Sequence, residues 1–435
     1  MKNKLFCIVL AAGFLCSCGD EVGTIDGEND DIQAVMADAD AGTTAPETTP
    51  PMTTIPPTEA PDVNTEPPAE VMLAPSGEVE VYAEITLEEL LGAEEIALKN
   101  GSEAVDTSQT GTFEITAEYA YSGQLYAHPV SYTVADTTPP VVLNSGNSAM
   151  AELGSEFDLS DYVGFADNYD PTPKLTYTGY VDTSVCGTYY LTATATDSSG
   201  NAVTWDTQVE VVSEIPVPED NNPRLAFSTL IERYSAENAV FGIDVSKWQG
   251  EIDFEAVRDA GCSFVIMRIG TYYDEYALDQ YFATNIEAAK NAGLDVGVYI
   301  YTTANSEDEA RGNARWIAEN LAGAELDFPV VFDWESFSNF QQYEMSIHDL
   351  NCYFEAFADE LEGLGYSAML YSSKNFLNNF WYDHSDEYPI WLAHYTDETD
   401  YAGEYSMWQM SCYGQIDGIW ADVDLNILYT DKPMN

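Results

Sequence analysis

Eight short apolar segments lie between residues 241 and 429, and segments of helical periodicity separate the first six of them. Strands are expected near 241–246, 264–270, 295–302, 328–335, 367–372, 389–395, 405–411 and 423–429. Helices are expected near 253–260, 279–292, 306–322, 347–364 and 373–380, with Asp253 and Ser306 as N-caps and Gly261 and Gly293 as stops. Five β/α units followed by three plain strands predict a closed barrel, whose functional residues would gather where strands end.

The fourth of these segments ends in two acids. Val330-Val331-Phe332 is followed by Asp333-Trp334-Glu335. Because side chains alternate along a strand, Asp333 and Glu335 share a face, with Cβ atoms roughly 6 to 7 Å apart. Two acids at that separation can divide labour, one protonated and one ionised, as glycoside hydrolysis requires. For the D-x-E triplet alone, a solvated strand end is the competing interpretation.

Two more acids lie on other strands of the expected barrel. Asp244 closes the first strand, and Asp424 lies in the last strand, within Asp422-Val423-Asp424-Leu425-Asn426. Each alone would be read as a helix cap or an exposed strand end. Four acids on three strands instead predict one site at the mouth of the barrel.

Seven motifs occur along residues 241–429: G-I-D-V-S-K-W-Q-G (242–250), A-G-C-S-F-V-I-M-R-I-G (260–270), A-G-L-D-V-G-V-Y-I-Y (292–301), D-W-E (333–335), W-L-A-H-Y (391–395), W-Q (408–409) and D-V-D-L-N (422–426). Through them this part of the chain resembles the glycoside hydrolase family 25 lysozymes, the Chalaropsis type. The resemblance implies an irregular β/α (TIM-like) barrel with five helices and eight strands. It also implies cleavage of the β-1,4 bond between N-acetylmuramic acid and N-acetylglucosamine in peptidoglycan.

The resemblance also implies roles for the acids. Glu335 matches the family's proton donor, and Asp333, Asp244 and Asp424 match its other active-site acids. Asp333 could act as the nucleophile or could orient the 2-acetamido group of the substrate. We favour the second, because a nucleophile must face the opposite side of the sugar from the acid, whereas residues two apart on a strand point the same way. No cofactor and no metal are expected.

Aromatic side chains are frequent at the same strand ends and can offer apolar platforms to sugar rings. We expect Tyr301, Tyr371, Trp391 and Tyr395 to line the cleft, together with Gln409. Tyr299 and Trp408 are expected in the core, Trp334 in packing opposite its acidic neighbours, and His394 in a structural role.

The charge of the chain restricts its partners. With 75 acids against 14 bases, the net charge is -61, so nucleic-acid binding and electrostatic membrane docking are excluded as leading functions. The cysteines at 186, 262, 352 and 412 lack the spacing of a zinc site or of a disulfide framework, although a bridge between Cys352 and Cys412 remains open.

The N-terminus has the pattern of an export signal over residues 1–17. Lys2 and Lys4 precede the apolar run from Leu5 to Leu15, and Leu15-Cys16-Ser17-Cys18 resembles the lipobox of bacterial lipoproteins, in which Cys18 would be cleaved free and acylated. Ordinary signal cleavage nearby is the alternative. Residues 18–75 are acidic and then rich in Thr and Pro, which predicts a disordered linker.

A tandem repeat separates this linker from the barrel. Residues 105–117 align without gaps on residues 181–193 at an offset of 76. The second module resembles bacterial Ig-like surface domains through its segments 136–140 (D-T-T-P-P) and 167–171 (D-N-Y-D-P) and the G-T-Y-x-L-T-A-T-A-T-D-x-x-G-N run. We expect two small all-β Ig-like sandwiches at 76–136 and 137–213, a linker at 214–239 and the catalytic barrel at 240–435.

Together these features predict a multidomain, monomeric lysozyme, exported and held at the cell surface by a lipid on Cys18. The alternative is a surface lipoprotein whose barrel binds cell-wall glycan without cutting it. The presence of all four acids favours the enzyme.

Overall fold

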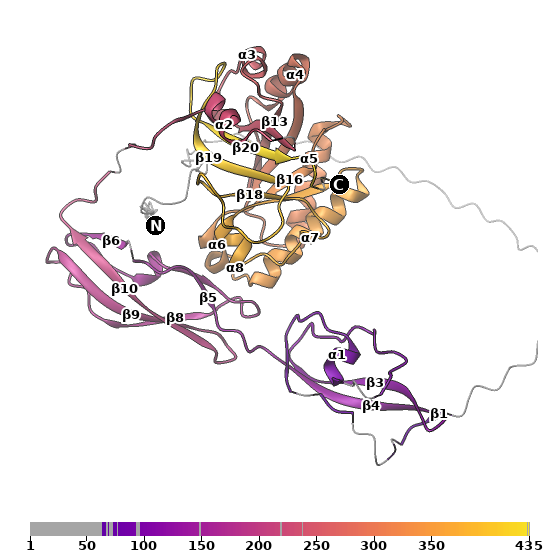
Figure 1. Cartoon of the computed structure of the whole chain (residues 1–435). Coiled ribbons are helices and arrows are strands. Elements are labelled where there is room, and N and C mark those ends of the chain that lie inside the picture. The colour runs from indigo at the N-terminus through magenta and orange to yellow at the C-terminus, as the bar shows by residue number, and fades with distance from the viewer. Residues whose placement is uncertain are drawn as a thin grey trace, which may run out of the picture. The chain divides into compact units, whose positions relative to one another are not determined.

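The computed structural model describes residues 63–66, 68, 73–75, 77–92, 96–147, 149–217, 220–236, 238–432 and 434. The expected signal at 1–17, Cys18 and most of the linker 18–75 lie outside the described residues. Among the described residues the chain divides into two compact units, one of residues 63–79 and 83–134, the other of residues 80–82 and 135–434 (Figure 1). No helix within this part of the chain combines the length and apolarity needed to cross a bilayer.

The first module contains one sheet and a helix. Strands β1 (Val63–Asn64), β4 (Gln124–Ala135) and β2 (Val79–Glu80) lie in that order, and β3 (Gly111–Tyr121) pairs with β4. Helix α1 (Leu87–Leu91) buries its three leucines and begins at Thr86, whose side chain forms a capping box with Glu89. The expected all-β composition is therefore wrong for this module. The T-x-x-E pattern before two leucines was the sequence signal of this helix.

The second module is a β structure of two sheets. One sheet has the order β6 (Ala149–Glu152), β10 (Ala202–Val212), β9 (Gly187–Thr196), β8 (Lys174–Gly179); the other pairs β5 (Val141–Asn144) with β7 (Gly164–Ala166). A short 3-10 helix, η1 (Leu159–Asp161), precedes β7. Leu191, Ala193 and Ala195 alternate inward along β9, and Phe165 of β7 lies in the same buried cluster. The alternation expected for an Ig-like sandwich is present.

The C-terminal domain is a closed eight-stranded barrel. Its strands are β12 (Ala239–Val245), β13 (Phe264–Tyr273), β15 (Asp295–Thr302), β16 (Val330–Asp333), β17 (Ala368–Ser373), β18 (Ile390–Ala393), β19 (Met407–Gln415) and β20 (Val423–Tyr429). They pair in chain order, and β20 closes the ring by pairing with both β19 and β12. This confirms the expected closed barrel of eight strands. The two-residue β11 (Leu225–Ala226) adds to β19, and β14 (Glu275–Leu278) adds to β13.

The last strand runs against its neighbours. Neighbouring strands from β12 to β19 are parallel, whereas β20 is antiparallel to both β19 and β12. The first residues of β20 therefore lie at the same edge of the barrel as the last residues of the parallel strands. An all-parallel TIM barrel lacks this feature.

Helices occur at all five expected places in the barrel domain. These are α3 (Phe254–Asp259), α4 (Phe282–Ala292), α5 (Glu307–Leu321), α7 (Ile347–Gly363) and α8 (Lys374–Asn379). Asp253 and Ser306 act as N-caps, as expected, by accepting hydrogen bonds from Ala256 N and Glu309 N. The count of five is too low, because α6 (Phe337–Gln342) and the 3-10 helix η2 (Lys247–Gln249) add to it. The linker expected at 214–239 is also wrong, because β11 and α2 (Phe227–Tyr234) lie in it and Phe227 and Leu230 pack in the buried cluster of the barrel domain. Over all described residues there are eight α helices.

Alternation along the strands divides the barrel residues between two buried clusters. Val330 and Phe332 of β16 belong to the larger cluster, which includes apolar residues of α3, α4, α5, α7 and α8. Val331 belongs instead to a second cluster inside the barrel, with Tyr299 and Trp391 among its members. Asp333, two residues after Val331, therefore points into the barrel interior, above an apolar floor.

Candidate active site

The polar site residues occupy interior positions on neighbouring strands. Asp244 of β12 lies directly opposite Asp424 of β20, and Asp333 lies opposite Tyr301 on one side and Tyr371 on the other. Directly paired residues share a face of the sheet. The structure thus brings the acids expected from three different strands to one end of the barrel.

Asp244 is the centre of a buried hydrogen-bond network. It is 5% exposed, and its Oδ2 accepts from Gln409 Nε2 at 2.9 Å and from Asn426 Nδ2 at 2.7 Å. Burial raises the pKa of Asp244 to about 6, and the two amide donors oppose that rise by stabilising the ionised form. Near neutral pH this carboxylate is therefore charged and held in place.

Three aromatic side chains fix the orientation of those amides. Tyr371 and Tyr395 both donate their hydroxyls to Gln409 Oε1, at 2.8 and 2.9 Å, and Trp391 donates Nε1–H to Asn426 Oδ1 at 2.8 Å. Since each carbonyl oxygen is occupied, each amide nitrogen faces Asp244. Burial raises the pKa of both tyrosines well above the usual value, so they remain neutral donors.

This network changes what these aromatics can offer to a ligand. Tyr371 and Trp391 are 7% and 2% exposed, and their rings meet edge to face at 4.8 Å. Both are placed in the barrel interior instead of presenting open faces. Tyr301 and Tyr395 are partly exposed, and the Tyr301 ring lies 5.4 Å from that of Tyr273.

Asp333 and Glu335 form a hydrogen-bonded pair of carboxyls. Asp333 is 5% exposed, whereas Glu335 is partly exposed. Burial raises the pKa of Asp333 well above its usual value, and the charge of Glu335 and a hydrogen bond with it add to the rise. Burial also raises the pKa of Glu335, but the hydrogen bond from Asp333 opposes that rise. Of the two carboxyls, Asp333 therefore keeps its proton to the higher pH.

A buried cation lies on the same interior face. Arg268 of β13 is 2% exposed and pairs with Asp279, with an Nη2 to Oδ2 distance of 3.0 Å. Its positive charge lowers the pKa of Asp333 and so opposes the effect of burial. Sequence reasoning missed Arg268, Asp279 and Asn426. For Arg268, the sequence signal was a single charged residue inside a mostly apolar strand. For Asn426, it was an amide side chain two residues after Asp424, on the same face of that strand.

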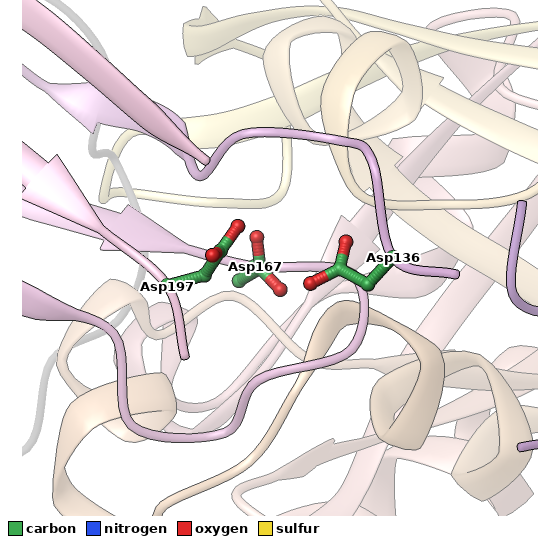
Figure 2. Close-up of side chains that lie close together, drawn as sticks. All are labelled: Asp136, Asp167 and Asp197. Atoms are coloured by element: carbon green, nitrogen blue, oxygen red, sulfur yellow. The ribbon is translucent and has the colours of Figure 1, made fainter. Parts of the chain in front are cut away.

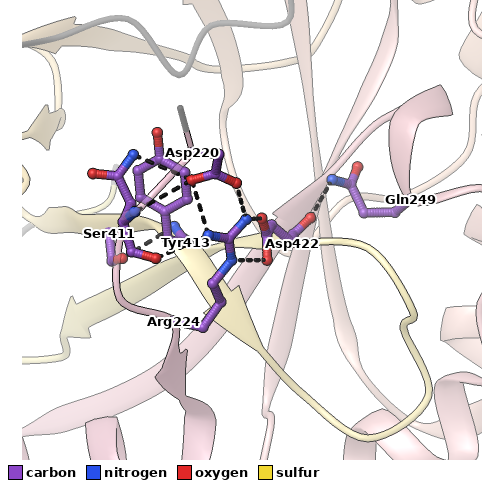
Figure 3. Close-up of polar contacts among 7 residues, drawn as sticks. Asp220, Arg224, Gln249, Ser411, Tyr413 and Asp422 are labelled. Carbon is purple, nitrogen blue, oxygen red and sulfur yellow. Dashed lines mark hydrogen bonds and ion pairs between the residues drawn. The ribbon is translucent and has the colours of Figure 1, made fainter. Parts of the chain in front are cut away.

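An ion pair outside the barrel interior holds the start of β20. Arg224 donates to both carboxylate oxygens of Asp422, at 3.0 and 2.6 Å, and also pairs with Asp220 (Figure 3). Gln249 Nε2 donates to the backbone oxygen of Asp422 at 2.9 Å (Figure 3). Gln249 also caps the turn after β12, because its Oε1 accepts from Ser246 N. The segments that carry Asp244 and Asp424 are thus tied together.

The aromatic residues expected in the core are buried in the barrel domain. Trp334 is fully buried, with its ring 5.2 Å from Phe340, and Trp408 is buried and donates to the backbone oxygen of His394 at 2.8 Å. Tyr299 lies in the interior apolar cluster. Cys186, Cys262, Cys352 and Cys412 are all free, so the structure contains no bridge between Cys352 and Cys412.

Asn426→Asp is expected to destabilise the barrel by about 2 to 3 kcal/mol at pH 7, because it removes a donor from Asp244 and buries a second carboxylate beside it. The loss of stability should become smaller toward pH 4, because protonation lets the new carboxyl and that of Asp244 share a hydrogen bond. Urea unfolding followed by tryptophan fluorescence measures this, since every tryptophan except Trp205 lies in the barrel domain. Asn375→Asp, at an exposed position, is the control. Equal stability of the two variants at pH 7 would contradict the network.

Two family models match this chain. Glycosyl hydrolases family 25 matches residues 243–419, and the bacterial surface protein Ig-like domain matches residues 141–211. The first match includes Asp244, Asp333 and Glu335 and ends before Asp424. The second covers the two-sheet module.

Three curated proteins are each similar to less than half of this chain. The uncharacterized protein YegX of Escherichia coli K12 is 31% identical over 201 residues, which are 45% of this chain and 71% of YegX. The autolytic lysozyme of Clostridium acetobutylicum is 29% identical over 189 residues, or 42% of this chain and 54% of that protein. Lysozyme M1 of Streptomyces globisporus is 29% identical over 203 residues, or 43% and 67%. Through its barrel, this chain belongs to glycosyl hydrolase family 25 and is a glycoside hydrolase that also carries an Ig-like domain.

Proposed function

We propose that this chain is a lysozyme that cleaves the β-1,4 bond between N-acetylmuramic acid and N-acetylglucosamine in peptidoglycan. The observation that carries the proposal is the hydrogen-bonded pair of carboxyls, Asp333 and Glu335, at the barrel mouth of a family 25 domain. The printed names of two relatives, an autolytic lysozyme and Lysozyme M1, support the same substrate class.

Glu335 is the residue that donates a proton to the leaving oxygen. It is the more exposed member of the pair, so it can reach a bound glycan. Before reaction the proton must move from Asp333 to Glu335. An acetamido N–H of the substrate that donates to Asp333 would favour the ionised form of Asp333 and so drive this transfer.

The substrate's own acetamido oxygen then serves as the nucleophile. As the bond from C1 to the leaving oxygen breaks, Glu335 gives its proton to that oxygen and the acetamido oxygen bonds to C1. The resulting cyclic cation carries a positive charge that ionised Asp333 stabilises. Glu335, now a carboxylate, takes a proton from water, whose oxygen attacks C1 and reopens the ring.

Asp244 and Asp424 have supporting roles in this proposal. Asp244 supplies a fixed negative charge below the reacting sugar, which favours an oxocarbenium-like transition state and raises the pKa of Glu335. Asp424 faces Asp244 across β12 and β20 and would bind sugar hydroxyls. Tyr301 and Tyr395 are the partly exposed aromatics that would contact the glycan.

Purified peptidoglycan tests the activity against the alternative of glycan binding without cleavage. Incubation with the chain should release soluble fragments whose new reducing ends are muramic acid. Sedimentation of the chain with peptidoglycan, without any new reducing ends, would establish the binding protein instead. New ends at glucosamine would show a different bond specificity.

The Ig-like domain and the cell-wall-directed barrel fit an exported protein. We further propose that the chain is a monomeric lipoprotein, cleaved after residue 17 and acylated on Cys18. The disordered linker expected at 18–75 is too long at its C-terminal end, because Val63 and Asn64 form β1 and pair with β4 of the first module. In chain order, the modules at 76–136 and 137–213 would separate this anchor from the catalytic domain, a variant of the TIM-like barrel.

Cys18→Ala is expected to move the protein from the membrane fraction to the soluble fraction without changing the rate of peptidoglycan cleavage. Two or more acyl chains hold a protein on a bilayer firmly, and nothing comparable replaces them. Fractionation followed by a high-salt wash measures the change. Cys186→Ala, at an exposed cysteine far from the N-terminus, is the control and should stay with the membranes. Membrane retention of Cys18→Ala would refute acylation at this residue.

A further inference from the structure

Three aspartates converge at one end of the second module. Asp136 precedes β5, Asp167 directly follows β7, and Asp197 opens the turn between β9 and β10 (Figure 2). One carboxylate oxygen of each lies within 4.8 Å of those of the other two. All three residues are buried, with exposures of 6%, 0% and 6%.

Most of the carboxylate oxygens in this cluster already accept hydrogen bonds. Asp167 Oδ1 accepts from the backbone N–H groups of Tyr169 and Asp170, at 3.0 and 2.7 Å. Asp197 accepts from Gly200 N and Asn201 N on Oδ1, and from Asn201 Nδ2 on Oδ2. Asp136 Oδ1 accepts from Thr138 N at 3.3 Å.

Two carboxylate oxygens of the cluster accept no hydrogen bond. Oδ2 of Asp136 and Oδ2 of Asp167 are buried and have no hydrogen-bond partner. Among the described residues, no lysine, arginine or histidine forms an ion pair with any of the three aspartates. Buried carboxylate oxygens without a donor or a counter-charge are costly, so this arrangement calls for a proton or a cation.

A cation bound between the three aspartates would serve both unpartnered oxygens and all three carboxylates at once, because a hard cation accepts several oxygen ligands.

We propose that the second module binds one Ca²⁺ ion between Asp136, Asp167 and Asp197. Oxygen-only donors suit a hard cation and disfavour zinc or copper, which prefer nitrogen or sulfur. Two oxygens on opposite sides of a Ca²⁺ ion, each at about 2.4 Å, stand about 4.8 Å apart. Three carboxylate oxygens that lie within 4.8 Å of one another can therefore share a single ion, with backbone oxygens or waters completing the shell. Mg²⁺ fits less well, because it keeps most of its water and a buried site has little room for water.

The site would hold three loops that are distant in the sequence. About 30 residues separate each aspartate from the next, and the loops are already linked by a hydrogen bond from Ser198 N to Asp170 Oδ2 at 2.7 Å. Binding to the folded state alone stabilises that state, so Ca²⁺ should raise the unfolding temperature of this module. The cluster went unnoticed in the sequence because its members lie far apart and match no contiguous metal-binding loop.

The first module lacks this site. Its β3–β4 hairpin turns through Ser122 and Gly123 alone, both with positive φ, whereas the β9–β10 turn spans residues 197–201. At the offset of 76 that aligns the repeats, Tyr121 takes the place of Asp197. The chain therefore offers one such site, not two, among its described residues.

Calorimetric titration of the chelator-treated full chain with CaCl₂ tests the proposal. It should be done in about 0.15 M NaCl with MgCl₂ present, to screen the many surface acids. One saturable Ca²⁺ site is expected, and Ca²⁺ should raise the midpoint of a calorimetric unfolding transition. Asp167→Asn should weaken this binding at least about tenfold and abolish the shift in midpoint, because it removes one of three charged ligands. Asp206→Asn, an exposed position on β10 of the same module, should leave both unchanged.

The variants also report on folding. Without Ca²⁺, Asp167→Asn should unfold at the same or a higher temperature than the unsubstituted chain, because it removes a buried negative charge. Asp136→Asn should show the same loss of binding, so a folding defect in one variant leaves the other to decide. Absence of a saturable site, or unchanged binding in both variants, would overturn the proposal. Tighter binding of Mg²⁺ than of Ca²⁺ would overturn the assignment of the ion.

Discussion

Glu335→Gln is expected to lower the rate of peptidoglycan cleavage by about 10² to 10⁴-fold, the usual contribution of general acid–base catalysis. Glutamine keeps the shape of the side chain and can still accept the hydrogen bond from Asp333, but it has no transferable proton. The change should therefore appear in kcat, while binding of glycan persists. Release of reducing ends from purified peptidoglycan gives the rate, and cosedimentation gives the binding.

The matched control is Glu251→Gln. Glu251 is exposed, in the loop that follows β12 and the short turn after it, so the substitution removes the same charge without touching the pair. Its rate should equal that of the unsubstituted chain. If Glu335→Gln cuts peptidoglycan at a near-normal rate, another residue is the proton donor.

Asp333→Asn is expected to abolish most of the cleavage activity, by about 10²-fold or more, because a neutral amide cannot stabilise the cyclic cation. It should at the same time stabilise the fold. Asp333 Oδ1 is buried without a hydrogen-bond partner, and ionising this carboxyl in the folded protein is costly. Loss of activity together with a gain in stability distinguishes a residue of the reaction from one that only maintains the fold.

The sign of the pH dependence follows from the raised pKa of Asp333. Between the ordinary pKa of an aspartate, about 4, and the raised value, the folded state binds more protons than the unfolded state. The contribution of Asp333 to stability is therefore present at low pH and is lost as the pH rises through that window. Asp333→Asn removes this dependence, so its stability advantage should be near zero at pH 4 and should grow toward pH 7.

Urea unfolding at several pH values measures this difference directly. Asp417→Asn, which removes an exposed carboxylate, should unfold in parallel with the unsubstituted chain at every pH. Parallel curves for Asp333→Asn and the unsubstituted chain would mean that the pKa of Asp333 is ordinary and that no shared proton exists.

Local sequence patterns were sufficient for the eight strands of the barrel, for five of its helices and for its acids. Period-2 and period-3.6 alternation placed the eight strands and the five main helices, and the side chains of Asp253 and Ser306 began two of those helices as expected. The D-x-E spacing predicted that Asp333 and Glu335 interact, which they do, but β16 ends at Asp333, so strand alternation places Asp333 alone. Helix α1 could have been predicted in the same way, because Thr86 and Glu89 form a capping box that is visible in the sequence.

What the sequence by itself determined is therefore local: which segments form strands or helices, which face each side chain takes, and which residue types stand at strand ends. The tertiary structure decided everything that depends on partners far along the chain. The donors to Asp244 lie 165 and 182 residues away, and no sequence period connects positions at such distances. The reversed direction of β20 brings Asp424 to the mouth, and closure of the barrel brings Arg268 close enough to act on Asp333. Electrostatic effects depend on distance and burial, and only the folded chain fixes both.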